Sequence, residues 1–464
     1  MTQTAIRELT DLVGEHRVSV HPSDLHRHAL DRSSGALLAK RRGDYGLPVC
    51  VVRPHTTAQV ADILRWAHDT KTPCVPYGGG SGVCEGIVSR DFVVIELRAL
   101  EEILDFDEKS LLVTTQAGVT GPDLAKALRS WGYQLGHEPQ SIEISTVGGW
   151  VATRAMGQLS AKYGGIEDLI VGLEAVLPGG KIVRTKTAPR RSAGPDLGAL
   201  MIGSEGTLGI VTEVTLRISP LLRDRVDRCI RFDHLTEGVD AARKIIQSDL
   251  APTMLRLYDA EDAEIFLRNH PEEPRGPLML LSFQGRHAEE RADEAVDVSG
   301  GRKATPALVA HWWEHRNNAV EEFTHLMSGR GILGPHAVVD TMEVAGTWSG
   351  LRGLYHSMKE SLSSHADIVG CHLSHVYKDG SCLYFTMASA CESDAEAAEK
   401  LETWWRVGME QCLRAGGTIS HHHGIGRRKA AWLETEMGGW YEVLGAVKRA
   451  VDPHRIMNPG ALGL

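Results

Sequence analysis

Residues 76–82 read Pro-Tyr-Gly-Gly-Gly-Ser-Gly and follow a short apolar stretch that is typical of a strand. Glycine lets a backbone come close to a ligand, and successive N–H groups in such a loop can converge on a phosphate. The spacing is neither the Gly-x-Gly-x-x-Gly of a strand-to-helix nucleotide loop nor the Gly-Lys-Ser/Thr of a P-loop. Taken alone, the cluster is explained almost as well by a turn that binds nothing.

Two further glycine clusters change this interpretation. Residues 145–153 read Ser-Thr-Val-Gly-Gly-Trp-Val-Ala-Thr, and residues 203–211 read Gly-Ser-Glu-Gly-Thr-Leu-Gly-Ile-Val and run into a strand. Three such clusters within one domain indicate a single long ligand that lies along the backbone. A dinucleotide has the required length.

The bulk properties describe an ordinary globular chain. Its 464 residues are too many for one hydrophobic core, so two or more domains are expected. A formal net charge of −10 argues against a general nucleic-acid binder, although a local basic pocket stays compatible with it. The 8 cysteines contain no Cys-x-x-Cys pair, and we expect reduced thiols.

No targeting or membrane segment is evident. The first 17 residues carry charges throughout, unlike a secretory signal, and no apolar run reaches 18 residues. We therefore expect a cytoplasmic protein and leave peripheral membrane contact open.

Periodicity outlines two regions and a tail. Residues 1–44 are expected to form a helix followed by a polar loop, and Thr57 to cap the next helix. Up to residue 220 strands and helices alternate, with strands at 48–53, 73–76, 92–97, 111–115 and 208–218. Residues 221–415 predict an antiparallel sheet with covering helices, among them 393–414 with Ser393 as N-cap. Residues 416–464 form a compact, motif-rich tail.

The three glycine clusters, in this order, resemble the FAD-binding domain of the vanillyl-alcohol-oxidase and para-cresol-methylhydroxylase (PCMH) superfamily over about residues 45–220. The resemblance implies an α+β fold, with a PCMH-type FAD-binding domain at 1–220, a cap domain with an antiparallel sheet at 221–415, and a C-terminal segment at 416–464 that returns to the FAD site. The implied FAD contacts are Pro76, Gly78, Gly79, Gly80, Ser81, Gly82, Ser145, Thr146, Gly148, Gly149, Thr153, Glu205, Gly209 and Ile210.

Some members of this superfamily attach FAD through a histidine of the first loop. Ser81, Gly82 and Val83 occupy that stretch here, so non-covalent binding is expected.

Within the superfamily the chain resembles the alkyldihydroxyacetonephosphate synthases, through residues 145–158, 189–195, 203–211, 334–348, 377–385 and 416–426. These enzymes exchange the acyl group of acyl-dihydroxyacetone phosphate for a fatty alcohol and make an ether lipid. The resemblance implies a covalent flavin N5 adduct in place of redox turnover. It also implies a small-molecule or lipid substrate that bears a phosphate or carboxylate, and we expect a homodimer.

Three adjacent histidines, His421, His422 and His423, lie between glycines, which is not a core pattern. On a strand, neighbouring side chains point to opposite faces, so three in a row rarely bind one ion, and no metal is expected. Acid/base and phosphate-binding roles are favoured for two of the three. The resemblance places the triplet at the flavin and substrate.

Tyr377 and Arg256 are the other catalytic candidates. Without the resemblance, Tyr377 is explained as a tyrosine at the end of a strand. The resemblance implies that Tyr377 is the catalytic base. In that role its pKa would have to be lowered, which nearby His or Arg cations could do. Arg256 interrupts an apolar strand and needs a partner. That partner is an acidic neighbour such as Asp259 or Glu261, or, by the resemblance, the phosphate or carboxylate of a substrate.

Two other histidine pairs are candidate ligand sites. The odd separation of His372 and His375 predicts opposite faces of a strand, which disfavours a shared metal. His311 and His315 stand four apart on an expected helix and could share a ligand, although such pairs more often lie on the surface.

Two alternatives compete with the synthase hypothesis. The D-lactate and D-2-hydroxyglutarate dehydrogenases share the fold and a tail like Asp452-Pro453 and Asn458-Pro459-Gly460. They usually carry Gly-Glu-His-Gly-x-Gly with a metal-bound Glu, whereas His422 takes that place here, which favours the synthase. A flavin-binding protein without activity is disfavoured by the intact His, Tyr and Arg set.

Overall fold

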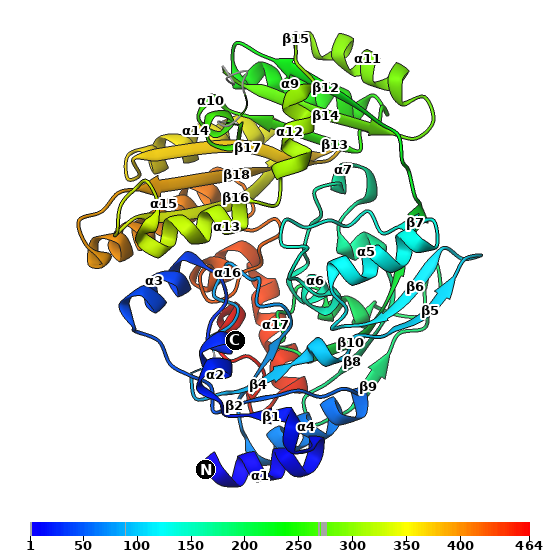
Figure 1. Ribbon diagram of the computed structural model, residues 1–464, viewed down its shortest axis with the longest axis vertical. Coiled ribbons are helices and arrows are strands. Elements are labelled where there is room, and N and C mark those ends of the chain that lie inside the picture. The colour runs from blue at the N-terminus through cyan, green and yellow to red at the C-terminus, as the bar shows by residue number, and fades with distance from the viewer. Residues whose placement is uncertain (1, 89, 268–269, 271–275) are drawn as a thin grey trace.

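The first 220 residues of the computed structural model build two larger sheets and a two-stranded sheet of β7 (Tyr133–Gln134) and β11 (Ser219–Pro220) (Figure 1). The structure describes residues 2–88, 90–267, 270 and 276–464. The first is a four-stranded sheet whose order is β1 (Val18–Ser19), β2 (Cys50–Val52), β4 (Val93–Glu96) and β3 (Cys74–Tyr77). Strands β2, β4 and β3 run parallel and are almost wholly buried. Helices α1 (Thr2–Val13) and α4 (Thr57–Thr70) pack together and supply apolar side chains to its core.

The second sheet is antiparallel and five-stranded. Its order is β5 (Ile103–Asp107), β6 (Leu112–Gln116), β10 (Ile210–Arg217), β8 (Ile170–Val176) and β9 (Ile182–Arg184). Helix α6 (Val147–Thr153), which carries part of the second glycine cluster, packs on β10 and β6. Two of the three clusters are thereby fixed to one sheet.

A seven-stranded antiparallel sheet follows in the chain. Its order is β15 (Arg302–Ala304), β12 (Arg225–Arg231), β14 (Leu278–Gln284), β13 (Met254–Tyr258), β17 (Ile368–Val376), β18 (Gly380–Ser389) and β16 (Val338–Thr347). Its large apolar core includes side chains of α9 (Leu235–Gln247), α11 (Ala288–Ser299), α14 (Trp348–Ser363) and α15 (Asp394–Arg414). Helices α10 (Ala260–Leu267) and α12 (Ala307–His315) share a second, smaller core with β13 and β14. The predicted α+β class, with an antiparallel sheet covered by helices, is confirmed.

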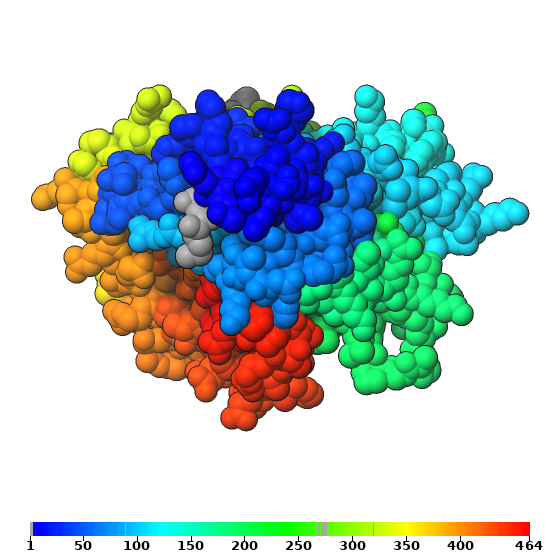
Figure 2. Space-filling view, turned by 90° about the horizontal axis from the view of Figure 1, so that it is seen from below, coloured from blue at the N-terminus to red at the C-terminus, as the bar shows by residue number. Residues whose placement is uncertain are grey.

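The C-terminal segment, with α16 (Ala430–Met437) and α17 (Gly439–Val451), returns to the N-terminal half, and Figure 2 shows it against the early part of the chain. The N–H of Cys74 donates to the carbonyl of Ile456 at 2.7 Å. The Asn458 side-chain amide donates to the carbonyls of Gly86 and Glu205 at 3.0 and 2.8 Å. These bonds place the C-terminal segment beside the first and third glycine loops.

Two local predictions are wrong and one is confirmed. Residues 1–44 are not one helix and a loop, because α2 (Pro22–His28) and α3 (Ser34–Arg42) follow α1. The Ser33 hydroxyl caps α3 by accepting from the N–H of Ala36. Helix α4 is capped by Thr56 and not by Thr57, whose hydroxyl donates to Glu174 at 2.8 Å. Ser393 caps α15 as predicted.

All 8 cysteines are free thiols, as predicted from their spacing. Among the described helices, none combines the length and the apolar character that crossing a membrane requires.

Candidate active site

One large cavity opens between the glycine loops, the seven-stranded sheet and the tail. All the predicted FAD contacts lie in its wall, namely Pro76, Gly78, Gly79, Gly80, Ser81, Gly82, Ser145, Thr146, Gly148, Gly149, Thr153, Glu205, Gly209 and Ile210. The wall also contains Asp31, Arg32, Ser34 and Asn458, which were not among the predicted FAD contacts. The run Ser33-Ser34-Gly35 was an available signal for the first three of them.

The first loop has the donors that a dinucleotide pyrophosphate needs. Among the described residues, no protein acceptor receives a hydrogen bond from the backbone N–H groups of residues 78–82. Five adjacent free N–H groups beside a cavity suit a phosphate oxyanion. The donor chemistry of the loop therefore fits FAD.

The first and second loops meet without room for a side chain. A Cβ atom at Gly79 would lie 1.9 Å from the carbonyl oxygen of Ile144, and one at Gly78 would lie 2.5 Å from Thr146 Oγ1. The two loops therefore form one continuous wall only because these residues are glycines.

Replacing Gly79 by alanine is expected to remove FAD from the purified protein, because the added methyl group pushes the two loops apart. The ratio of flavin to protein absorbance measures the effect. Gly353→Ala is the matched control, since a Cβ atom there meets nothing within 4 Å. A Gly79→Ala protein with a full complement of flavin would contradict the assignment of the loop.

Glu205 lines the cavity, but its carboxylate is used by the protein. It accepts from the N–H groups of Ile425 at 2.6 Å and Gly426 at 2.9 Å. Its contribution to the site is therefore to hold the loop that carries the histidines.

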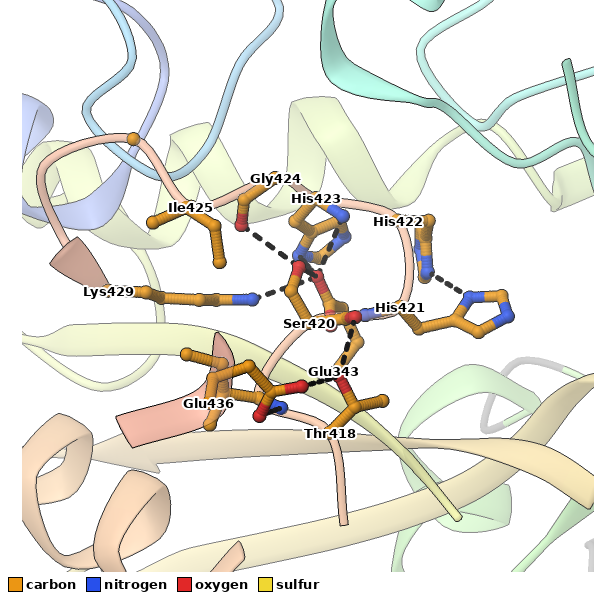
Figure 3. A network of polar contacts seen from close by, with 12 residues as sticks. Glu343, Thr418, Ser420, His421, His422, His423, Gly424, Ile425, Lys429 and Glu436 are labelled. Carbon is orange, nitrogen blue, oxygen red and sulfur yellow. Dashed lines mark hydrogen bonds and ion pairs between the residues drawn. The ribbon is translucent and has the colours of Figure 1, made fainter. Parts of the chain in front are cut away.

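The histidine triplet is a loop and not a strand, so the predicted alternation of side chains is wrong. The buried carboxylate of Glu343 on β16 determines its shape (Figure 3). Glu343 accepts from the N–H groups of His421 and His423 at 2.7 Å each, and from the Ser420 hydroxyl at 3.0 Å. Lys429, which is also fully buried, donates to it at 2.9 Å.

The charges at this loop lie on Glu343 and Lys429 and not on the imidazoles. Burial by itself raises the pKa of Glu343, but the Lys429 ammonium and His423 outweigh it and lower that pKa to about 2. Burial lowers the pKa of His421 and of His423 to about 4, and that of His422 well below its ordinary value. The three imidazoles are therefore neutral at pH 7.

Of the predicted catalytic residues, Arg256, His422 and His423 line the cavity, while His421 and Tyr377 do not belong to its lining. The Tyr377 hydroxyl lies 3.0 Å from His421 Nε2. Burial raises the pKa of Tyr377, whereas a basic role required that it be lowered, so this part of the prediction is wrong.

Tyr384 is the tyrosine that reaches the cavity, and the sequence analysis missed it. It lies on β18 between His372 of β17 and Glu343 of β16, and its ring centroid is 4.8 Å from that of His372. Tyr384 and Thr386 stand two apart on a strand and both line the cavity. That spacing of polar side chains was the available signal.

His372 and His375 line the same cavity, contrary to the prediction of opposite faces. The pairing of β17 with β18 shifts between Ser374 and Val376, and His375 has a φ of 55°. This bulge breaks the alternation on which the prediction depended. It brings the His375 ring centroid to 5.1 Å from His421 and 4.7 Å from His422.

Ring nitrogens of His375, His421 and His422 lie within 4.8 Å of one another, close enough to hold a metal ion. Four of their six nitrogens are engaged already, because His375 bonds Ser160, His421 bonds Tyr377, and the two Nδ1 atoms of His421 and His422 lie 3.0 Å apart. We therefore expect metal analysis to find no stoichiometric transition metal in the purified protein. One equivalent of zinc or iron that a chelator removes would contradict this.

Arg256 is not paired with either predicted acidic neighbour. Asp259 and Glu261 bind Lys359, at 2.7 and 3.3 Å, and within the described chain no ion pair joins Arg256 to a carboxylate. Its charge is left for a ligand.

Comparison with known proteins agrees with this site. Residues 223–462 match the family of FAD linked oxidases, C-terminal domain, and residues 48–186 match the FAD binding domain. The chain is 31% identical to the uncharacterized FAD-linked oxidoreductase YgcU of Escherichia coli (strain K12), over 98% of this chain and 97% of that protein. It is 28% identical to alkyldihydroxyacetonephosphate synthase of Dictyostelium discoideum, over 94% of this chain and 76% of that one.

A D-lactate dehydrogenase of Anaerostipes hadrus is 30% identical, with 89% of each chain covered. A solved structure of alkyldihydroxyacetonephosphate synthase superposes with a TM-score of 0.81 at 26% identity, over 98% of this chain and 85% of that one. The structure of p-cresol methylhydroxylase superposes with a TM-score of 0.79 at 16% identity, over 99% and 96%, which shows a shared fold. The chain therefore belongs to the family of FAD-linked oxidases, and FAD is its cofactor.

Proposed function

We propose that this protein is an ether-forming transferase of the alkyldihydroxyacetonephosphate synthase type. An acyl-dihydroxyacetone phosphate and a long-chain alcohol would give the alkyl ether and a free fatty acid. The reaction involves no net oxidation, so it would consume no electron acceptor.

The observation that carries the proposal is the pair of neutral histidines, His422 and His423, in the cavity wall. His422 stands where the dehydrogenase pattern has a metal-bound glutamate. His423 Nδ1 is buried 3.7 Å from Glu343 Oε1, and among the described residues no protein hydrogen bond engages its Nε2. A neutral imidazole with a free nitrogen can accept a proton from the substrate carbon.

The other groups fit the same reaction. Burial raises the pKa of Tyr384, so its hydroxyl keeps its proton and can donate it to a leaving carboxylate. Arg256 can bind the substrate phosphate through its planar set of donors. Phe266, Val320 and Phe323 add an apolar wall for an acyl or alkyl chain. FAD, when bound, supplies an electrophilic ring system for the substrate carbon.

The test is product analysis without oxygen. FAD-loaded protein is incubated with palmitoyl-dihydroxyacetone phosphate and hexadecanol, and the lipids are identified by mass spectrometry. We expect the hexadecyl ether and one released palmitate per ether, with no added electron acceptor. If no ether forms at any alcohol concentration, the result contradicts the proposal.

Oxidation of a D-2-hydroxy acid is the second candidate, favoured by the similarity to a D-lactate dehydrogenase and by the uncompensated charge of Arg256. It predicts that D-lactate or D-2-hydroxyglutarate bleaches the flavin without any alcohol. An acceptor dye would then restore the oxidised spectrum.

A further inference from the structure

The Asp-Pro and Asn-Pro-Gly motifs near the C-terminus, at residues 452–453 and 458–460, take no part in the proposed chemistry. Asp452 and Asn458 are nevertheless almost fully buried, with 0% and 2% of their surfaces exposed. Such polar side chains are buried where partners satisfy their polar atoms. The contacts of Asn458, and those of Lys448, which pairs with Asp452, reach the loops around the flavin cavity.

Asp452 fixes the turn that carries Asn458. Its two carboxylate oxygens accept, at 3.1 and 2.9 Å, from the N–H groups of the two residues before Asn458. The buried Lys448 ammonium donates to Asp452 at 2.6 Å, and at 2.7 Å to the carbonyl of Thr207 in the third glycine cluster. The turn is therefore anchored to the third cluster.

The Asn458 side chain joins the third cluster to the chain just after the first. Its amide group donates one hydrogen to the carbonyl of Gly86 at 3.0 Å and the other to the carbonyl of Glu205 at 2.8 Å. Its Oδ1 accepts from Arg427 Nη2 at 3.3 Å. Among the described residues no other donor reaches the Glu205 carbonyl. Asn458 lines the cavity, but both of its donors are used by the protein.

The backbone at this position suits an asparagine. The φ of Asn458 is 38°, in the left-handed region that asparagine adopts more readily than most residues. Its N–H donates at 2.8 Å to the carbonyl of Cys74 on β3, the strand that leads into the first glycine cluster. Backbone and side chain of Asn458 therefore both bind segments of the cofactor site.

Glu205 extends these contacts to the second cluster and to the histidine loop (residues 421–423). Its N–H donates at 2.8 Å to the carbonyl of Ala152 in α6, and its carboxylate accepts from the backbone N–H groups of residues 425–426. Its φ of 50° is uncommon for a residue other than glycine and persists only where surrounding contacts hold it. The Asn458 amide is one of those contacts.

We propose that Asn458 is a positioning residue for the cofactor. It fixes the spacing between Gly86 and Glu205 in the cavity wall, and through Glu205 it holds the histidine loop beside the flavin. The inference goes beyond the proposed function, because FAD binding and the order of one loop can be measured whichever reaction the protein catalyses.

The test is the release of FAD from the FAD-loaded protein on dilution, followed by the fluorescence of free flavin. Asn458→Asp keeps the shape of the side chain and an acceptor for Arg427, but it turns a carboxylate oxygen toward the two carbonyl groups. Asn458→Gly suits the left-handed backbone and leaves room for water. We expect the dissociation constant for FAD to rise about tenfold or more in Asn458→Asp and by less in Asn458→Gly.

Hydrogen exchange measured by mass spectrometry tests the coupling through Glu205. With FAD in excess, the peptide that covers residues 420–428 should exchange faster in Asn458→Gly than in the unmodified protein. Tyr441→Phe is the matched control, because the Tyr441 hydroxyl donates at 3.3 and 3.2 Å to two carbonyl groups near the end of the chain and does not line the cavity. It should leave FAD release and exchange unchanged.

An unchanged affinity for FAD in Asn458→Gly would overturn the positioning role, and this variant decides the question if Asn458→Asp does not fold. A larger loss in Asn458→Gly than in Asn458→Asp would show that packing and not the amide hydrogens holds the loops, which also overturns it. Weakened FAD binding with unchanged exchange at residues 420–428 would overturn the coupling to the histidine loop. Equal losses in Tyr441→Phe and Asn458→Gly would show that any loosening of the tail releases FAD, and would overturn the specific role of Asn458.

Discussion

Replacing Tyr384 by phenylalanine is expected to lower kcat for ether formation by about 10²–10⁴-fold, the range typical of a lost general acid or base. The hydroxyl lies in the cavity wall and keeps its proton, so its removal takes away a donor at the reacting atoms. The KM for the phosphate substrate should change little, because in the proposed site Arg256 and not Tyr384 binds that end.

Tyr377→Phe is the matched control, since it removes the same atom from a tyrosine that does not line the cavity. It loses one hydrogen bond to His421, and we expect a loss of less than tenfold in kcat. Steady-state kinetics of both variants, with flavin content checked, distinguish the two tyrosines. A larger loss in Tyr377→Phe than in Tyr384→Phe would reverse the assignment.

Replacing Lys429 by methionine is expected to lower the free energy of unfolding by about 3–5 kcal/mol, the usual result of leaving one charge of a buried pair alone. Both Lys429 and Glu343 are fully buried, and the Lys429 ammonium keeps the pKa of Glu343 near 2. Denaturant unfolding of the FAD-loaded protein measures the loss.

The double variant Glu343→Leu/Lys429→Met tests the reason for this loss. It removes both charges, so part of the stability should return. Recovery should be incomplete and activity should stay low, because the histidine loop loses the acceptor for three of its donors. Equal stability of the single and double variants would show that the pair is not coupled.

The sequence was sufficient to predict that the three glycine clusters line one cavity, because the signals of these clusters are local. Residues 76–82, 145–153 and 203–211 each carry their signal in consecutive glycines and hydroxyls, and every FAD contact inferred from them lines one cavity. The strands and helices that hold these loops could also be predicted locally, from the spacing of their apolar residues.

The catalytic side of the cavity could be predicted only in part, because it depends on pairing between distant strands. The bulge at His375 turns the His375 side chain to the cavity side of β17, and no local sequence pattern predicts this bulge. Tyr384 was missed because its importance comes from its neighbours on β16 and β17, Glu343 and His372, which are far away in the sequence. The pKa of Tyr377 depends on burial, which a motif does not contain.

The most direct test of the central claim is the release of the cofactor by acid. Precipitating the purified yellow protein with trichloroacetic acid should leave one equivalent of FAD per chain in the supernatant and a colourless pellet, because the first loop has no histidine for a covalent bond. Flavin that stays with the pellet, or a supernatant that contains FMN or no flavin, would contradict the account.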